Sequence, residues 1–207
     1  MSTRESIIEH LKDKYSPEAV IVYGSFADGT ANLNSDFDAL VIADRPALHD
    51  TTVFDGTLLD VFVYPPETFG DDIDPHDFLQ IYDGIVVFDQ NGLAGRLKDK
   101  VRAYVLGMPP KSDEELRDEL TWCEKMLART VRGDAEGAYR WHWLLVDSLE
   151  IYSDLKKQYY FGPKKTLKKM AAEDKEAFEK YCAALKKLDH VCLSEWIDYL
   201  KTILKPL

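Results

Sequence analysis

The chain has 207 residues, 45% of them hydrophobic and 12% aromatic, which is enough for one large or two small domains with buried cores. Its formal net charge of −11 argues against long nucleic acid as a partner, because such binding needs Lys and Arg to neutralise phosphates. No run of about 18 apolar residues occurs, so no membrane span is expected.

The start of the chain and its cysteines indicate a compartment. Residues 1–6 lack the apolar core of a signal peptide, so we expect a cytoplasmic protein. Cys123, Cys182 and Cys192 are odd in number and lack metal-type spacing, which predicts reduced cysteines packed among helices.

The first predicted elements are an amphipathic helix over residues 5–14 and a buried strand over residues 20–23. Gly24 and Ser25 then interrupt the strand. Glycine permits close backbone approach, and a serine hydroxyl and the N–H groups of a following helical turn bind oxygen atoms. This turn is therefore a candidate binding site for the phosphates of a ligand.

Two carboxylates stand at the head of the next strand, which is predicted over residues 37–43. Alternate side chains of a strand point to the same face, so Asp36 and Asp38 should face one point, about 7 Å apart along the backbone. Mg²⁺ prefers oxygen ligands and commonly shares one or two carboxylates with the phosphates of a substrate. The pair is therefore a candidate magnesium site.

A third carboxylate lies in an apolar run. Asp55-Gly56 is a strong two-residue hairpin signal within residues 51–64, and Asp60 is the one charge in the second strand of this hairpin. Burying a lone carboxylate costs several kcal/mol or more, so Asp60 needs a partner, which shared metal ions would supply. Asp55 and Asp44 are alternatives for the third position, but both sit beside turn residues, where a solvated aspartate is ordinary.

The remainder of the first half predicts a turn or helix start at residues 65–67, a strand over 84–89 and a helix over 92–106. Gly, Pro and Lys then gather in residues 107–111, the clearest boundary in the sequence. We expect a first domain over residues 1–107 with a small mixed β-sheet.

After this boundary the pattern becomes helical. Ser112 and Glu115 form a capping box that predicts a helix through about residue 132. Further helices are predicted over residues 136–160, from residue 163, over 175–188 and over 194–204. The sequence therefore predicts an α+β protein, in which the small mixed sheet is followed by an all-α helical bundle over residues 112–207.

The helix over residues 136–160 has apolar side chains around nearly its whole circumference, which predicts a central buried helix. Asp147 and Glu150 are three residues apart and share a face, so either could serve as a general base or bind an ammonium group. The alternative is an ordinary solvent-facing stripe together with Asp154 and Lys157.

Lys164 and Lys165 follow Pro163 at the start of a predicted helix. Two cations there oppose the helix dipole, since that end of a helix favours anions, and a bound triphosphate would explain the placement. The alternative is a solvated basic turn.

The order Gly24-Ser25, ten residues, Asp36-x-Asp38 and then an acidic residue on a neighbouring strand resembles the signature of the polymerase-β-like nucleotidyltransferase superfamily. The resemblance covers residues 18–64, and the two-domain layout resembles the antibiotic nucleotidyltransferases of aminoglycosides and lincosamides. It implies that the three aspartates, with Asp60 as the third, are catalytic ligands of two Mg²⁺ ions, and that the Gly-Ser turn positions the triphosphate.

One position departs from the family pattern. Many compact members carry Ala-Arg-Gly after the Gly-Ser segment, whereas this chain has Asp28 between Ala and Gly. The missing cation suggests that another basic group contacts the triphosphate, and Lys164 and Lys165 are the candidates.

The implied function is that of a Mg²⁺-dependent nucleotidyltransferase of the EC 2.7.7 type. It would move a nucleoside monophosphate, AMP from ATP being the expected case, to a hydroxyl of a small acceptor and release pyrophosphate. An aminoglycoside-type antibiotic is the acceptor class that the layout and the acidic charge favour, since such compounds are cationic. The resemblance favours Glu150 as the general base, with Asp60 and Asp147 as alternatives.

Two other functions compete with this one. The first is an antitoxin-type adenylyltransferase that modifies a partner protein, and the second is a non-catalytic regulator that binds nucleotides. No sequence feature indicates an oligomeric state.

Overall fold

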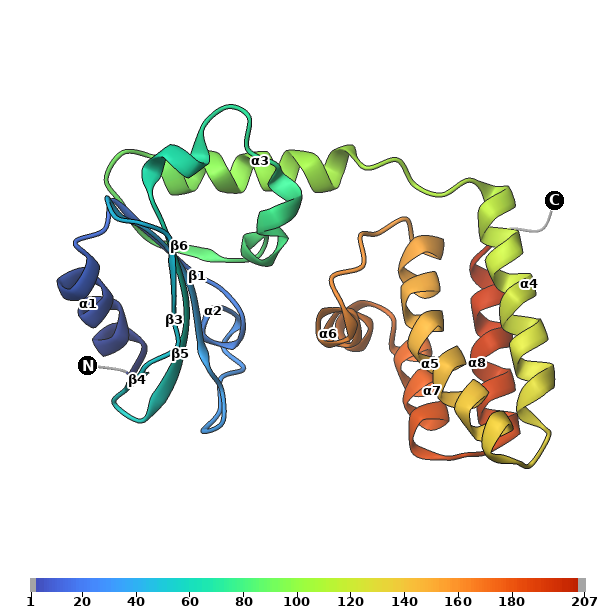
Figure 1. The fold of residues 1–207 in the computed structure, drawn as a ribbon. Coiled ribbons are helices and arrows are strands. Elements are labelled where there is room, and N and C mark those ends of the chain that lie inside the picture. Colours follow the sequence, from blue (N-terminus) through green and yellow to red (C-terminus); the bar gives the residue numbers. More distant parts are fainter. Residues whose placement is uncertain (1–2, 205–207) are drawn as a thin grey trace. The chain divides into compact units, whose positions relative to one another are not determined.

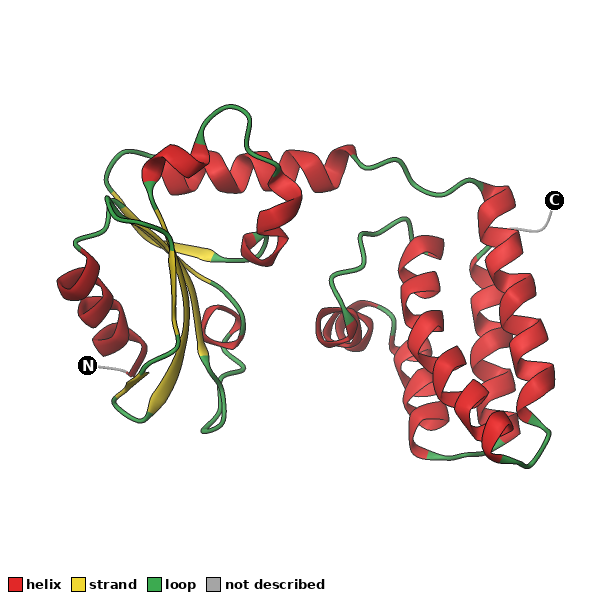
Figure 2. Cartoon of the chain, in the orientation of Figure 1, coloured by secondary structure: helices red, strands yellow, loops and turns green. Residues whose placement is uncertain are grey.

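The chain forms two compact units, residues 1–108 and residues 109–207, in a computed structural model that describes residues 3–204. We call them the sheet unit and the helical unit. Figure 1 follows them by sequence colour, and Figure 2 shows that the strands belong to the first unit alone. The predicted α+β class is confirmed.

The sheet unit combines strands with α-helices and two short 3₁₀ helices, η1 and η2. In chain order its elements are α1 (Thr3–Tyr15), β1 (Ala19–Val22), α2 (Ser25–Asp28), β2 (Phe37–Ile42), β3 (Leu48–Asp50), β4 (Val53–Phe54), β5 (Thr57–Tyr64), η1 (Pro66–Phe69), η2 (Pro75–Ile81), β6 (Ile85–Asp89) and α3 (Leu93–Gly107).

The six-stranded sheet has the order β3-β5-β2-β1-β6, and β4 pairs with β5 beside this path. β2 and β5 run parallel, whereas the other pairs are antiparallel. The predicted turn between β4 and β5 is confirmed, since Asp55 and Gly56 both have positive φ, as a type I′ hairpin turn requires. The sequence pattern does not reveal β3, because its three residues are too few to establish a period.

Helices cover both faces of the sheet. On one face α1 packs through Ile7 and Leu11 against alternate residues of the central strands, such as Val41. On the other face η1, η2 and α3 cover residues of the opposite parity, such as Leu40 and Ile42. Figure 1 shows α1 and α3 on opposite sides of the sheet. Residues 38 and 60 therefore belong to the face that α3 covers, and both lie in the N-terminal halves of their strands, β2 and β5.

The helical unit is built around one apolar core to which all five helices contribute. These helices are α4 (Asp113–Thr130), α5 (Ala135–Leu155), α6 (Pro163–Glu173), α7 (Lys175–Lys186) and α8 (His190–Ile203). The predicted capping box is confirmed, because the Ser112 hydroxyl accepts from Glu115 N, and a Glu115 carboxylate oxygen accepts from Ser112 N at 2.8 Å. No helix of residues 3–204 is long and apolar enough to cross a membrane.

Helix α5 differs from the sequence prediction in its end and in its burial. It ends at Leu155 rather than near residue 160, and Lys157 two residues later has a positive φ of 55°, which cannot continue a helix. It is also not buried all round, since Trp143 is 40% and Val146 64% exposed. Apolar residues on the outer side of a helix extend the periodic pattern without being in the core.

The formal charge is divided unevenly between the units. Residues 1–108 contain 8 Lys and Arg against 19 Asp and Glu, whereas residues 109–207 contain 18 of each. The whole net charge of −11 therefore belongs to the sheet unit, and the helical unit is neutral. The acidic character expected of the whole chain is confined to one of its two units.

Candidate active site

The turn after β1 lies directly against Asp38. Tyr23 N donates to Asp38 O at 3.0 Å, which holds the turn beside the start of β2. Gly24 has φ +64°, and a Cβ placed on it would lie 2.0 Å from Asp38 Oδ2. Only glycine fits here, because any side chain would collide with the carboxylate and would also need a left-handed backbone.

Ser25 begins the short helix α2 immediately after this glycine and is only 7% exposed. The backbone N–H groups of Ala27 and Asp28 both donate to Gly24 O at 3.1 Å, so the turn is fixed in its helical form. The Asp28 carboxylate accepts from Thr30 N at 3.0 Å and from the Thr30 hydroxyl at 2.5 Å. The residue that replaces a family arginine therefore stabilises the end of α2.

Asp38 and Asp60 are direct partners in the parallel pairing of β2 with β5. Neighbouring strands lie about 4.8 Å apart, so the two side chains stand next to each other on the same face. Burial raises the pKa of the Tyr23 hydroxyl, and the negative charges of Asp38 and Asp60 raise it further, which shows that both carboxylates lie near this phenol. Asp60 is thus the carboxylate that lies beside Asp38 on the neighbouring strand.

Asp36 lies one residue before β2 and is exposed. Its position has the parity of Asp38, as the sequence predicts, but it belongs to the loop rather than to the strand. The structure thus brings together the Gly-Ser turn, Asp38 and Asp60, with Asp36 at the rim of this group.

The adjacent carboxylates of Asp38 and Asp60 are possible ligands of a metal ion. Within residues 3–204 no three His, Cys, Asp or Glu side chains are close enough to enclose a metal by themselves. An open pair of carboxylates nevertheless fits Mg²⁺, which usually keeps waters and binds one or two carboxylates together with substrate phosphates. A side chain at position 24 would displace the Asp38 carboxylate, so the glycine allows Asp38 to stay beside Asp60.

His49 is a neighbour of the site that the sequence analysis missed. This residue lies on the edge strand β3, and its Nε2 is 2.5 Å from Asp60 Oδ1. Its ring stacks on Phe62, with centroids 4.1 Å apart and an angle of 6° between the ring planes. A partner for the Asp60 carboxylate is therefore present within the protein. The sequence could have revealed the contact between His49 and Asp60 only through the pairing register of β3 with β5.

Glu150 belongs to the helical unit, where it is exposed on α5. Burial raises the pKa of Tyr160, and the charges of Glu150 and Asp147 add to this, so the two carboxylates and this phenol share one side of the unit. Asp147 accepts from Trp143 Nε1 at 2.6 Å. Asp154, which would belong to a solvent-facing stripe, is instead 2.7 Å from the ammonium group of Lys111.

Lys164 and Lys165 lie in the first turn of α6, also in the helical unit. The ammonium group of Lys165 lies over the ring of Phe161, 4.7 Å from its centroid. This cation–π contact attracts the Lys165 ammonium group to the ring of Phe161.

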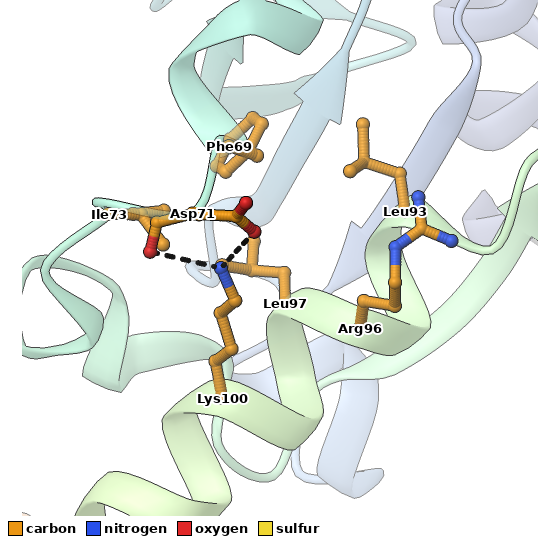
Figure 3. A pocket seen from close by; sticks show the side chains of 7 residues that line it. All are labelled: Phe69, Asp71, Ile73, Leu93, Arg96, Leu97 and Lys100. Atoms are coloured by element: carbon orange, nitrogen blue, oxygen red, sulfur yellow. Dashed lines mark hydrogen bonds and ion pairs between the residues drawn. The ribbon is translucent and has the colours of Figure 1, made fainter.

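A pocket of about 230 Å³ lies elsewhere on the sheet unit, between η1, the loop that follows it and α3 (Figure 3). Phe69 and Leu97 form part of its apolar lining, and Lys100 reaches across to donate to Gly70 O at 2.9 Å. None of its lining residues is a predicted site residue.

A family model matches most of the sheet unit. Residues 4–93 match the model described as a nucleotidyltransferase domain, and this range includes Gly24, Ser25 and all three aspartates. A solved structure of a nucleotidyltransferase-like protein from Exiguobacterium sibiricum is similar over 98% of this chain and 74% of its own, with 12% identity and a TM-score of 0.41. The comparison with curated proteins gives no match.

Proposed function

Because residues 4–93 match the model of a nucleotidyltransferase domain, we propose that the protein belongs to the polymerase-β-like superfamily and moves a nucleoside monophosphate from a nucleoside triphosphate to a hydroxyl, with release of pyrophosphate. The observation that carries this proposal is the side-by-side placement of Asp38 and Asp60 next to the Gly24 turn. Carboxylates and a phosphate-binding turn on one face are the parts that such a transfer needs.

Within this proposal each residue has a role. Asp36, Asp38 and Asp60 would bind Mg²⁺, and Gly24 and Ser25 would orient the triphosphate for in-line attack. Two bound Mg²⁺ ions would supply stabilisation of the attacking and leaving oxygens. The carboxylates and the turn hold the reacting groups in line.

The helical unit would bind the acceptor. Glu150 would remove the proton of the acceptor hydroxyl, with Asp60 and Asp147 as alternatives, and Lys164 and Lys165 would contact the triphosphate. These assignments come from the sequence and its resemblance to the antibiotic nucleotidyltransferases.

We further propose ATP as the donor and a small cationic compound, such as an aminoglycoside, as the acceptor. The charge of −11 on the sheet unit supports both proposals. A triphosphate that approaches such an acidic unit needs bound Mg²⁺ to offset the repulsion, and a cationic acceptor is attracted to the unit.

The test is pyrophosphate release from each of the four nucleoside triphosphates with Mg²⁺, measured against a panel of aminoglycosides and lincosamides. Asp38→Asn should lower acceptor-dependent release by about 100-fold or more, because it removes a metal ligand without changing the side-chain shape. Asp55→Asn is the matched control, since Asp55 is exposed in a turn that accepts asparagine equally well.

Equal activity of the Asp38 and Asp55 variants would contradict the assigned site. Binding of Mg·ATP without release for any small acceptor would instead favour a protein acceptor or a regulatory role.

A further inference from the structure

Asp60 has a partner, His49, that is not part of the family motif. We propose that His49 is a positioning residue that fixes the Asp60 carboxylate for binding of the divalent cation. This inference rests on the proposed function, because it gives Asp60 a metal to bind.

His49 lies on the strand next to the one that carries Asp60. β5 lies between β2 and β3, so Asp60 has Asp38 on one side and His49 on the other. His49 pairs directly with Phe62, two residues beyond Asp60, and residues two apart on a strand share a face. His49 therefore lies diagonally across from Asp60 on that face, where long side chains reach each other.

The imidazole of His49 is held in a fixed direction. Its ring lies flat on Phe62, with centroids 4.1 Å apart, and this stacking points Nε2 at Asp60 Oδ1. Oδ1 is thereby engaged at 2.5 Å, and in the proposed arrangement Oδ2 is the oxygen that binds the cation.

The contact with His49 lowers the entropy that the Asp60 side chain loses when a metal binds. A half-exposed carboxylate with free rotation loses side-chain entropy when it binds a metal. Asp60 is 38% exposed and His49 44%, so solvent reaches the pair, and the hydrogen bond and the ring stacking limit its motion. Hydrogen bonds to metal-binding carboxylates typically change metal affinity by about 10- to 100-fold when removed.

Two substitutions separate the hydrogen bond from the ring. His49→Phe keeps a flat ring on Phe62 but removes the nitrogen, whereas His49→Gln keeps a side-chain N–H donor and removes the stacked ring. His10→Phe is the matched control, because the His10 ring also stacks on a phenylalanine, Phe54, at 3.9 Å, and does so on the α1 face of the sheet.

The measurement is the affinity for Mn²⁺ in the presence of a non-hydrolysable ATP analogue, followed by the electron paramagnetic resonance signal of free Mn²⁺. We expect His49→Phe to weaken Mn²⁺ binding by about 10-fold or more. His49→Gln should stay within about threefold of the wild type, and His10→Phe should match it. Circular dichroism of each variant establishes that it is folded.

Three other outcomes would overturn the inference. Unchanged Mn²⁺ affinity in folded His49→Phe would refute the role of His49 and leave the proposed function intact. Equal losses in the Phe and Gln variants would mean that the ring, not the hydrogen bond, is what matters. Failure of the wild type to bind Mn²⁺ with nucleotide would refute the proposed function and this inference together.

Discussion

Gly24 matters because of what its missing side chain leaves free. The glycine has a positive φ of 64°, and a Cβ placed on it would lie 2.0 Å from Oδ2 of Asp38, one of the proposed metal ligands. Both properties, the positive φ and the close approach, are satisfied only by glycine. A second glycine, Gly29 at the end of α2, has φ +76° but open space where a side chain would stand. Substitution of Gly29 therefore introduces backbone strain alone, whereas substitution of Gly24 introduces both strain and a collision with Asp38.

We predict that Gly24→Ala abolishes measurable nucleotidyl transfer, with a fall of at least about 100-fold, because the new methyl group would displace the Asp38 carboxylate. Gly29→Ala carries only the strain of a positive φ, about 1–2 kcal/mol, and should keep most of the activity. Pyrophosphate release and thermal unfolding, measured on both variants, check this. Similar activity losses in the two variants would show that strain in α2, not the contact with Asp38, controls the site.

Sequence reasoning reached the residues whose role is local and missed those that depend on pairing between distant strands. The Asp55-Gly56 turn and the Ser112 capping box each lie within a few residues, so their chemistry can be recognised directly. His49 reaches Asp60 only because β3 pairs with β5 in one particular register, and a three-residue strand carries too little pattern to reveal it. The parallel pairing of Asp38 with Asp60 could be expected only from the family resemblance.

At the scale of elements, Asp174 joins three helices of the bundle. It caps the start of α7, and its carboxylate accepts from Tyr152 of α5 at 2.9 Å and from Tyr199 of α8 at 2.8 Å. Lys156, at the end of α5, completes the group at 2.7 Å. The side chain is only 13% exposed, so these contacts are little screened by solvent.

Burial alone would raise the pKa of Asp174, but the Lys156 ammonium group and the donors around it lower the pKa to about 2. The folded-state pKa is therefore below the unfolded value, and the unfolded chain takes up the proton first as the pH falls. The stabilisation is complete above about pH 4 and is lost as the pH falls towards about 2. Its size is about 2 kcal/mol.

We predict that Asp174→Asn lowers the free energy of unfolding of the helical unit by about 2 kcal/mol at pH 7, although asparagine caps helices equally well. The difference from the wild type should shrink as the pH falls from about 4 to about 2. Urea unfolding followed by tryptophan fluorescence checks this. Asp189→Asn, at the exposed cap of α8, is the control and should change stability by less than about 0.5 kcal/mol. A constant difference at all pH values would contradict the charge explanation.

At the scale of the whole molecule, the two units have separate apolar cores. Tryptophan is confined to the helical unit, so its fluorescence reports the unfolding of that unit alone. The four tryptophans are Trp122, Trp141, Trp143 and Trp196. The sheet unit carries the proposed nucleotide site and is silent in this signal.

We predict that Mg·ATP raises the unfolding temperature of the sheet unit by more than that of the helical unit, because the sheet unit carries the three aspartates and the Gly-Ser turn, whereas the helical unit contributes only Lys164 and Lys165 to the proposed triphosphate site. At about 100 times the dissociation constant, binding stabilises the folded state by about 2.7 kcal/mol, which corresponds to about 10 °C for a domain of this size. Differential scanning calorimetry should show one strongly and one weakly shifted transition, and tryptophan fluorescence identifies the weakly shifted one as that of the helical unit. An unchanged fluorescence midpoint would contradict the proposed contact of Lys164 and Lys165 with the triphosphate, and an unchanged transition of the sheet unit would contradict the proposed nucleotide site.

The concentration of all net negative charge in the sheet unit has a consequence for kinetics in salt. An anionic nucleotide is repelled by this unit, whereas a cationic acceptor is attracted, and ions in solution screen both interactions beyond about 8 Å at physiological ionic strength. Added salt should therefore ease the approach of the nucleotide and slow that of the acceptor. The two substrates of one reaction would respond to ionic strength in opposite directions.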